Sequence, residues 1–66
     1  METKDIVIEV FVNDSYFTTW GVFDSIQDAK DYAYTNISNG WICKIFEGEK
    51  LRVVVECNSD RVTFQV

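Results

Sequence analysis

The chain has 66 residues, so we expect one domain near the lower size limit for independent folding. Eleven acidic residues against six basic ones give a net charge of −5. This balance argues against nucleic acid or an anionic membrane as the main partner, because phosphate groups are bound by clustered Lys and Arg. With 47% hydrophobic and 15% aromatic residues, a core is expected to form without a metal or a disulfide.

Residues 6–12 and 16–23 are predicted to form a β-hairpin. The first segment is rich in β-branched residues, and its alternation puts four of them on one face: Ile6, Ile8, Val10 and Val12. Residues 13–15 (Asn-Asp-Ser) are the expected turn, since Asn and Asp tolerate a left-handed backbone. Strict alternation in the second segment predicts two faces, one with Phe17, Thr19, Gly21 and Phe23, the other with Tyr16, Thr18, Trp20 and Val22.

A helix is predicted after the hairpin. Two pairs of residues have the three-residue spacing of a capping box at its start: Asp24 with Gln27, or Ser25 with Asp28. Apolar residues recur at helical spacing and form one narrow stripe: Ile26, Ala29, Ala33 and Ile37. Asn39 and Gly40 are expected to end the helix, with Gly40 in the left-handed C-cap position.

Two strands follow at residues 41–46 and 51–57, joined by a turn at residues 47–50. A second turn at residues 58–60 leads into a candidate last strand at residues 61–66. The sequence therefore predicts a single small α+β domain spanning residues 1–66. In it, a single helix packs on a small antiparallel sheet in the order ββαββ(β).

The chain offers no pattern typical of an active site. It has no histidine, and Cys43 and Cys57 are fourteen positions apart without CxxC spacing. We predict a non-enzyme without metal or cofactor, whose cysteines are buried and reduced. The polar residues 1–5 predict no signal peptide, and no apolar stretch reaches the roughly 20 residues that cross a bilayer.

The predicted helix also has a polar face. Four residues lie away from the apolar stripe: Asp28, Asp31, Tyr32 and Thr35. This face is either solvated, with acids placed near the positive end of the helix dipole, or an acidic and aromatic contact surface. Because the buried stripe is narrow, at least one of Tyr32 and Tyr34 is expected to be partly exposed.

A series of residues along the chain occurs in the same order in a known family. The series is Phe11, Asn13, Ser15, Phe17 and Thr18, with Asp14 as an acidic match, then Ala33, Asn39, Lys44, Phe46, Glu56 and Cys57. On these positions the chain resembles, over residues 6–58, the Dmd antitoxins of T4-like bacteriophages. No single motif carries this resemblance. The family has a Trp where this chain has Tyr32, and the resemblance does not extend to the last predicted strand.

The resemblance implies a function and a partner. Dmd-like antitoxins bind bacterial toxins of the RnlA/LsoA kind, endoribonucleases that degrade phage mRNA, and block them by direct contact near the catalytic region. On the matching positions, the resemblance implies that Tyr32 and Asn39 contact the toxin. Carboxylates at Asp28 and Asp31 suit a cleft that attracts phosphate. Asn39 has a second interpretation, as a residue that merely ends the helix.

Three alternative hypotheses describe the function of this chain. The first is an antitoxin in the cytoplasm of the infected bacterial host, monomeric or weakly dimeric when free. The second is a structural or oligomerising phage accessory protein. The third is an RNA-binding module that stacks bases on Tyr16, Trp20, Trp41 and Phe46, which the scarcity of basic residues disfavours relative to core packing.

Overall fold

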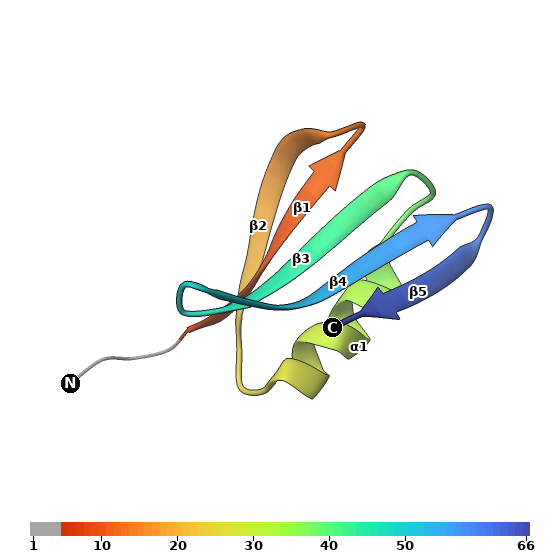
Figure 1. Cartoon of the computed structure of the whole chain (residues 1–66). Helices are drawn as coiled ribbons and strands as arrows, with labels where there is room; N and C mark the ends of the chain where they lie inside the picture. The colour runs from red at the N-terminus through yellow and green to blue at the C-terminus, as the bar shows by residue number, and fades with distance from the viewer. Residues whose placement is uncertain (1–4) are drawn as a thin grey trace.

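The computed structural model describes residues 5–66 of the chain (Figure 1). Its elements, in chain order, are β1 (Ile6–Val12), β2 (Ser15–Phe23), α1 (Ile26–Asn36), β3 (Trp41–Glu47), β4 (Lys50–Asn58) and β5 (Arg61–Gln65). The predicted α+β class is confirmed, and the candidate last strand completes the order ββαβββ. The prediction that the chain has no signal peptide was made from residues 1–5. Residues 1–4 lie outside the described residues.

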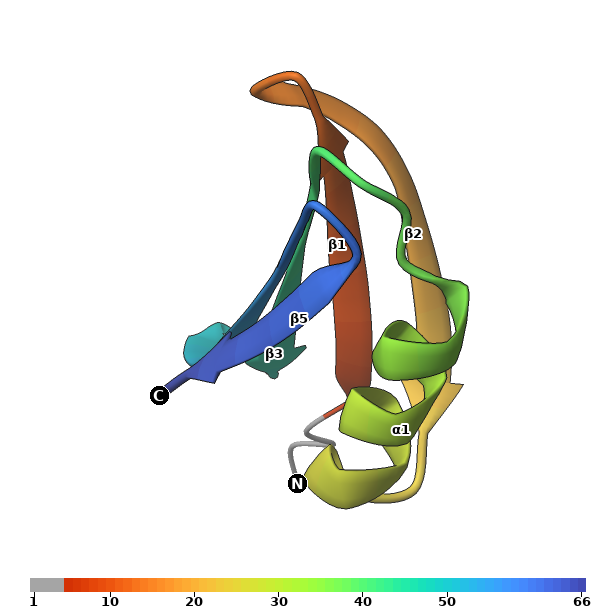
Figure 2. The same ribbon diagram turned by 90° about the vertical axis from the view of Figure 1, so that its right-hand side faces the viewer.

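The five strands form one antiparallel sheet in the order β2-β1-β3-β4-β5. Helix α1 connects β2 to β3, and β3 pairs with β1 instead of β2. Figure 2 shows α1 lying along one face of the sheet, which we call the covered face. The opposite, uncovered face carries Phe11 and Lys44, and no other element of residues 5–66 packs on it.

Two hairpins turn through a pair of residues with positive φ. Asn13 and Asp14 (φ 54° and 66°) join β1 to β2, and Ser59 and Asp60 (φ 54° and 65°) join β4 to β5. Consecutive positive φ values are typical of a type I′ turn, whose twist matches that of paired strands. The first turn is therefore shorter than predicted, because Ser15 already belongs to β2.

A β-bulge near the start of β2 redirects its side chains. Thr18 pairs with Val10, whereas Tyr16 already pairs with the next residue of β1, so Phe17 is an extra residue in β2. The ring of Tyr16 packs edge-on against Phe11, on the uncovered face. Phe17 instead packs against Trp41, a residue that contacts the buried core.

A second irregularity lies near the end of β2. Trp20 pairs with Ile8 and Phe23 pairs with Ile6, so β2 has one residue more than β1 between these two pairs. Trp20 and Phe23 therefore both lie on the covered face, where they pack against the core. The prediction that they occupy opposite faces is wrong, because strict alternation is lost wherever a strand gains a residue.

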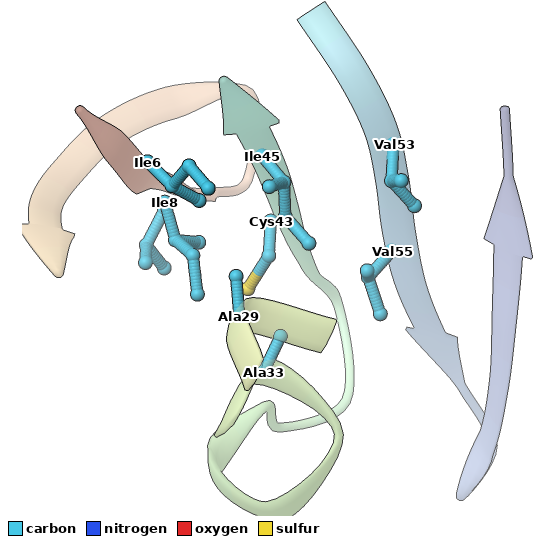
Figure 3. Packing of buried hydrophobic residues seen from close by; sticks show 9 residues of the cluster. Ile6, Ile8, Ala29, Ala33, Cys43, Ile45, Val53 and Val55 are labelled. Carbon is cyan, nitrogen blue, oxygen red and sulfur yellow. The ribbon is translucent and has the colours of Figure 1, made fainter. Parts of the chain in front are cut away.

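The core lies between α1 and the covered face of the sheet (Figure 3). Its fully buried side chains are Ile8, Val10, Ala29, Ala33, Cys43, Ile45 and Val55. In Figure 3, Ala29 and Ala33 point from α1 toward the side chains of the sheet, and their small size allows the helix backbone to approach closely. The predicted apolar stripe is confirmed, since Ile26 and Ile37 pack against the same cluster.

The two ends of α1 differ in how well the sequence predicts them. Ser25 is the N-cap, which selects one of the two predicted capping pairs. The helix ends at Asn36, with Ile37 already in an extended conformation, so the predicted end at residues 39 and 40 is wrong. Gly40 does adopt a positive φ of 85°, but it serves the entry into β3, where its N–H donates to the carbonyl oxygen of Cys57 at 2.8 Å. The extended backbone of Ile37 allows this side chain to pack on the core.

Candidate protein-binding surface

Neither cysteine is placed for nucleophilic chemistry. Cys43 and Cys57 are both buried and free, as predicted. Burial raises the pKa of the Cys43 thiol to about 11, so the reactive thiolate is scarce at neutral pH. Within residues 5–66, no three His, Cys, Asp or Glu side chains are grouped closely enough to hold a metal ion.

Helix α1 presents four of the five predicted binding residues on one face. Asp28, Asp31, Tyr32 and Thr35 follow i, i+3, i+4, i+7 spacing, which keeps them within about 100° around the helix axis. All four are exposed. The face is anchored at its start by Ser25, whose hydroxyl oxygen accepts the backbone N–H of Asp28 at 3.0 Å.

The polar groups on this face are not equally available to a partner. The side-chain amide of Gln27 donates to the carboxylate of Asp31 at 3.0 Å, and the Thr35 hydroxyl donates to the carbonyl oxygen of Asp31 at 3.0 Å. Asp28 lies in the first turn, where the helix dipole favours a negative charge. The face therefore offers two exposed carboxylates, whereas the hydroxyl of Thr35 is used within the helix.

On the other side of α1, Tyr34 and Lys30 contact Phe64 of β5. The ring of Tyr34 stacks on that of Phe64 with centroids 6.4 Å apart, and the Lys30 ammonium lies 5.5 Å from the Phe64 centroid. Lys30 is the only basic residue of α1, so Asp28 and Asp31 are the only charged groups that α1 places beside Tyr32. Tyr32 and Tyr34 are 42% and 60% exposed, which confirms that at least one tyrosine is partly exposed.

Tyr32 is held in place by two aromatic residues of β2. Its ring packs edge-on against Trp20 and tilted against Phe23, with centroids 5.3 Å apart in both pairs. These contacts cover part of the ring, and the residue remains 42% exposed. Tyr32 is therefore a fixed, partly exposed ring, which is the kind of side chain that often dominates a binding interface.

Tyr32 belongs to a chain of aromatic contacts, which we call the aromatic row: Phe17, Trp41, Trp20, Tyr32 and Phe23. Successive ring centroids are 5.7, 6.2, 5.3 and 5.3 Å apart. Sequence reasoning predicted Tyr32 as a binding residue but missed its neighbours in the row. The available signal was the density of aromatic residues in positions 16–23, and it was obscured because alternation assigned Trp20 and Phe23 to different faces.

Asn39 does not lie with the other predicted binding residues. It sits in the loop between α1 and β3, where its Oδ1 accepts the backbone N–H of Asp60 at 2.7 Å and the thiol of Cys57 at 3.2 Å. Its Nδ2 donates to the carboxylate of Asp60 at 3.2 Å. Asn39 thus connects this loop to the β4–β5 turn, a structural role that differs from the predicted one of ending the helix, which already stops at Asn36.

The aromatic residues considered for base stacking are divided between the two faces of the sheet. Trp20 and Trp41 pack partly against the core, as the core-packing interpretation predicts. Tyr16 pairs with Phe11, and Phe46 alternates with the buried Ile45, so both lie on the uncovered face. The four rings therefore do not form one continuous stacking surface.

No family model, curated protein or solved structure matches this chain. Helix α1 has 11 residues, and no helix within residues 5–66 is long and apolar enough to cross a membrane.

Proposed function

We propose that this protein is an antitoxin that binds a bacterial endoribonuclease toxin of the RnlA/LsoA kind and blocks it near its active site. The observation that carries the proposal is the position of Tyr32, which is 42% exposed, fixed by Trp20 and Phe23, and flanked on the helix by Asp28 and Asp31. The resemblance to Dmd-like antitoxins supports the same position from the sequence.

The surface suits a cleft that normally binds RNA. A ribonuclease attracts the phosphate backbone of RNA with basic groups. Exposed carboxylates on the inhibitor are negatively charged like the phosphates, so they are attracted to the same basic groups. The two acids are expected to speed the encounter, and Tyr32 then supplies apolar area that becomes buried. The chain needs no catalytic group of its own for this activity, which takes place in the cytoplasm of the infected host.

The proposal is tested by titrating the purified protein into an RnlA-type toxin, with calorimetry for binding and RNA cleavage measured in the same samples. The expected result is saturable binding and a loss of cleavage that follows the bound fraction. Binding without loss of cleavage contradicts inhibition. Absence of binding contradicts the proposal as a whole, and binding of RNA by the protein alone favours the nucleic-acid alternative.

The role of Tyr32 is tested against a matched residue of the same helix. Tyr32→Ala is expected to weaken toxin binding by about tenfold or more, because truncating a hot-spot aromatic residue costs about 2 kcal/mol or more and a tenfold change corresponds to about 1.4 kcal/mol. Tyr34→Ala is the control, since Tyr34 is equally aromatic and more exposed but lies on the β5 side. Equal effects of the two substitutions contradict the assignment of the Tyr32 face.

The carboxylates are tested through the association rate. Asp28→Asn is expected to slow association at low ionic strength and to change the rate little at high salt, because salt screens long-range attraction between exposed charges. Glu49→Gln, in the exposed turn between β3 and β4, removes the same charge away from α1. An identical salt dependence for the two variants contradicts steering by the helix face.

A further inference from the structure

We infer that the partner surface is the whole aromatic row, running from α1 across β2 to Phe17, and that its occupant is a protein with an apolar groove edged by basic groups. The inference rests on the proposed function and deepens it, because it names binding residues outside the helix. Phe17, Trp20 and Trp41 then contribute to the same interface as Tyr32.

The two irregularities of β2 place its aromatic side chains on one face. Without the extra residue at position 17, alternation from Trp20 puts Phe17 on the uncovered face. Without the register shift near Gly21, the same alternation also puts Phe23 on the uncovered face. Bulges commonly redirect a side chain beside a functional site. Here both of them bring phenylalanine rings to the side of Trp20 and α1.

The resulting surface is continuous but only partly buried. Phe17 at one end is 58% exposed and Tyr32 is 42% exposed, whereas Trp20 and Trp41 between them are partly buried against the core. Apolar residues gathered in this way on a small domain mark an interaction surface more often than single exposed residues do.

The charged residues near the aromatic row indicate which kind of partner protein it binds. Asp28 and Asp31 border the row on α1, and three basic side chains are engaged elsewhere. Lys30 lies over Phe64, Lys44 lies over Phe11 on the uncovered face, and Arg52 forms an ion pair with Glu47. An apolar strip bordered by acids is complementary to an apolar groove bordered by Lys and Arg.

A second copy of this chain fits the row less well. It brings the same acidic border, so an isologous contact places like charges near one another. The irregular pairing of β2 also makes this edge strand unsuitable for regular strand-to-strand pairing between copies. The structure therefore favours a basic partner over self-association.

The test compares two neighbouring residues of β2 in the complete protein, with an RnlA-type toxin as the probe. Phe17→Ala is expected to weaken binding by about tenfold, and Tyr16→Ala by less than about twofold, since contacts outside an interface centre are nearly neutral. Both side chains are 58% exposed, but Tyr16 faces Phe11 on the uncovered face. Equal effects of the two substitutions overturn the inference, even if the toxin binds and Tyr32→Ala weakens it.

A second measurement needs no substitution. The chain has only two tryptophans, Trp20 and Trp41, and both belong to the row. Fluorine NMR of protein labelled with 5-fluorotryptophan is expected to show both signals shifting when unlabelled toxin saturates the protein. Unchanged signals in a saturated complex overturn the inference and leave the proposed function standing.

Two further outcomes are distinguishable. If wild-type protein does not bind the toxin at all, both the proposed function and this inference fail. If the free protein self-associates in sedimentation and Phe17→Ala abolishes only that association, the row is a self-contact and the inference is overturned.

Discussion

The carboxamide of Asn39 forms two hydrogen bonds with Asp60, although the two residues are 21 positions apart. Its oxygen accepts the Asp60 backbone N–H at 2.7 Å, and its nitrogen donates to the Asp60 carboxylate at 3.2 Å. This pair fastens the loop after α1 to the β4–β5 turn, where Asp60 has a positive φ of 65°. Asn39, for which the sequence resemblance predicts toxin contact, thus connects two segments of the fold.

Asn39→Ala is expected to lower the free energy of unfolding by about 1 kcal/mol, because the N–H of Asp60 and the thiol of Cys57 lose their acceptor. Urea unfolding measures this loss. Asn36→Ala is the control, since its side chain only donates to the carbonyl oxygen of Tyr32 one helical turn away. Equal stability of the two variants contradicts a structural role for Asn39.

The same variant separates the two interpretations of Asn39. If Asn39 acts only within the fold, toxin affinity measured well below the melting temperature stays within about twofold of wild type. A loss of about tenfold or more in folded protein indicates direct contact with the toxin.

Ser25→Ala is expected to cost about 1 kcal/mol of stability, which is typical for removal of an N-cap hydroxyl. The reason is that the backbone N–H of Asp28 loses its acceptor at 3.0 Å. Thermal unfolding followed by circular dichroism measures the effect. Ser38→Ala, in the exposed loop after the helix, removes the same hydroxyl away from the helix start and is expected to change little.

Gly21→Ala is expected to destabilise the protein by about 1–3 kcal/mol through overpacking. A methyl group at this position lies 2.8 Å from Cγ1 of Val7 and 3.2 Å from its Cα atom. Denaturant unfolding of Gly21→Ala, Val7→Ala and the double variant measures the coupling between the two sites. Partial rescue in the double variant is expected, since the backbone of Val7 remains close; strict additivity contradicts the close approach.

Alkaline pH is expected to weaken the fold through Cys43. Burial raises the pKa of its thiol from 9.0 to about 11, so between these values the unfolded chain loses a proton that the folded chain retains. The contribution of Cys43 to the free energy of unfolding is fully present below pH 9. It falls between pH 9 and pH 11, by up to about 3 kcal/mol. Urea unfolding across this range measures it, and Cys43→Ala is expected to show a shallower fall; an equal pH dependence contradicts the assignment to Cys43.

Local patterns were sufficient to predict most of the elements. Alternation in residues 6–12 identified the buried side of β1, and the spacing of Ala29 and Ala33 identified the buried side of α1. Asn-Asp and Ser-Asp pairs marked two turns that use positive φ. These features depend on residues a few positions apart, so the sequence by itself determined them, together with the acidic face that carries Asp28 and Asp31.

The arrangement of the candidate site depended on tertiary structure. Whether β2 keeps strict alternation is decided by its pairing with β1, and the two irregularities in that pairing bring Phe17 and Phe23 to the face that carries Trp20. The early end of α1 and the hydrogen bonds of Asn39 likewise depend on contacts with the core and with the β4–β5 turn. The sequence determined which side chains are available, whereas the aromatic row exists only because strands and helix distant in the chain pack together.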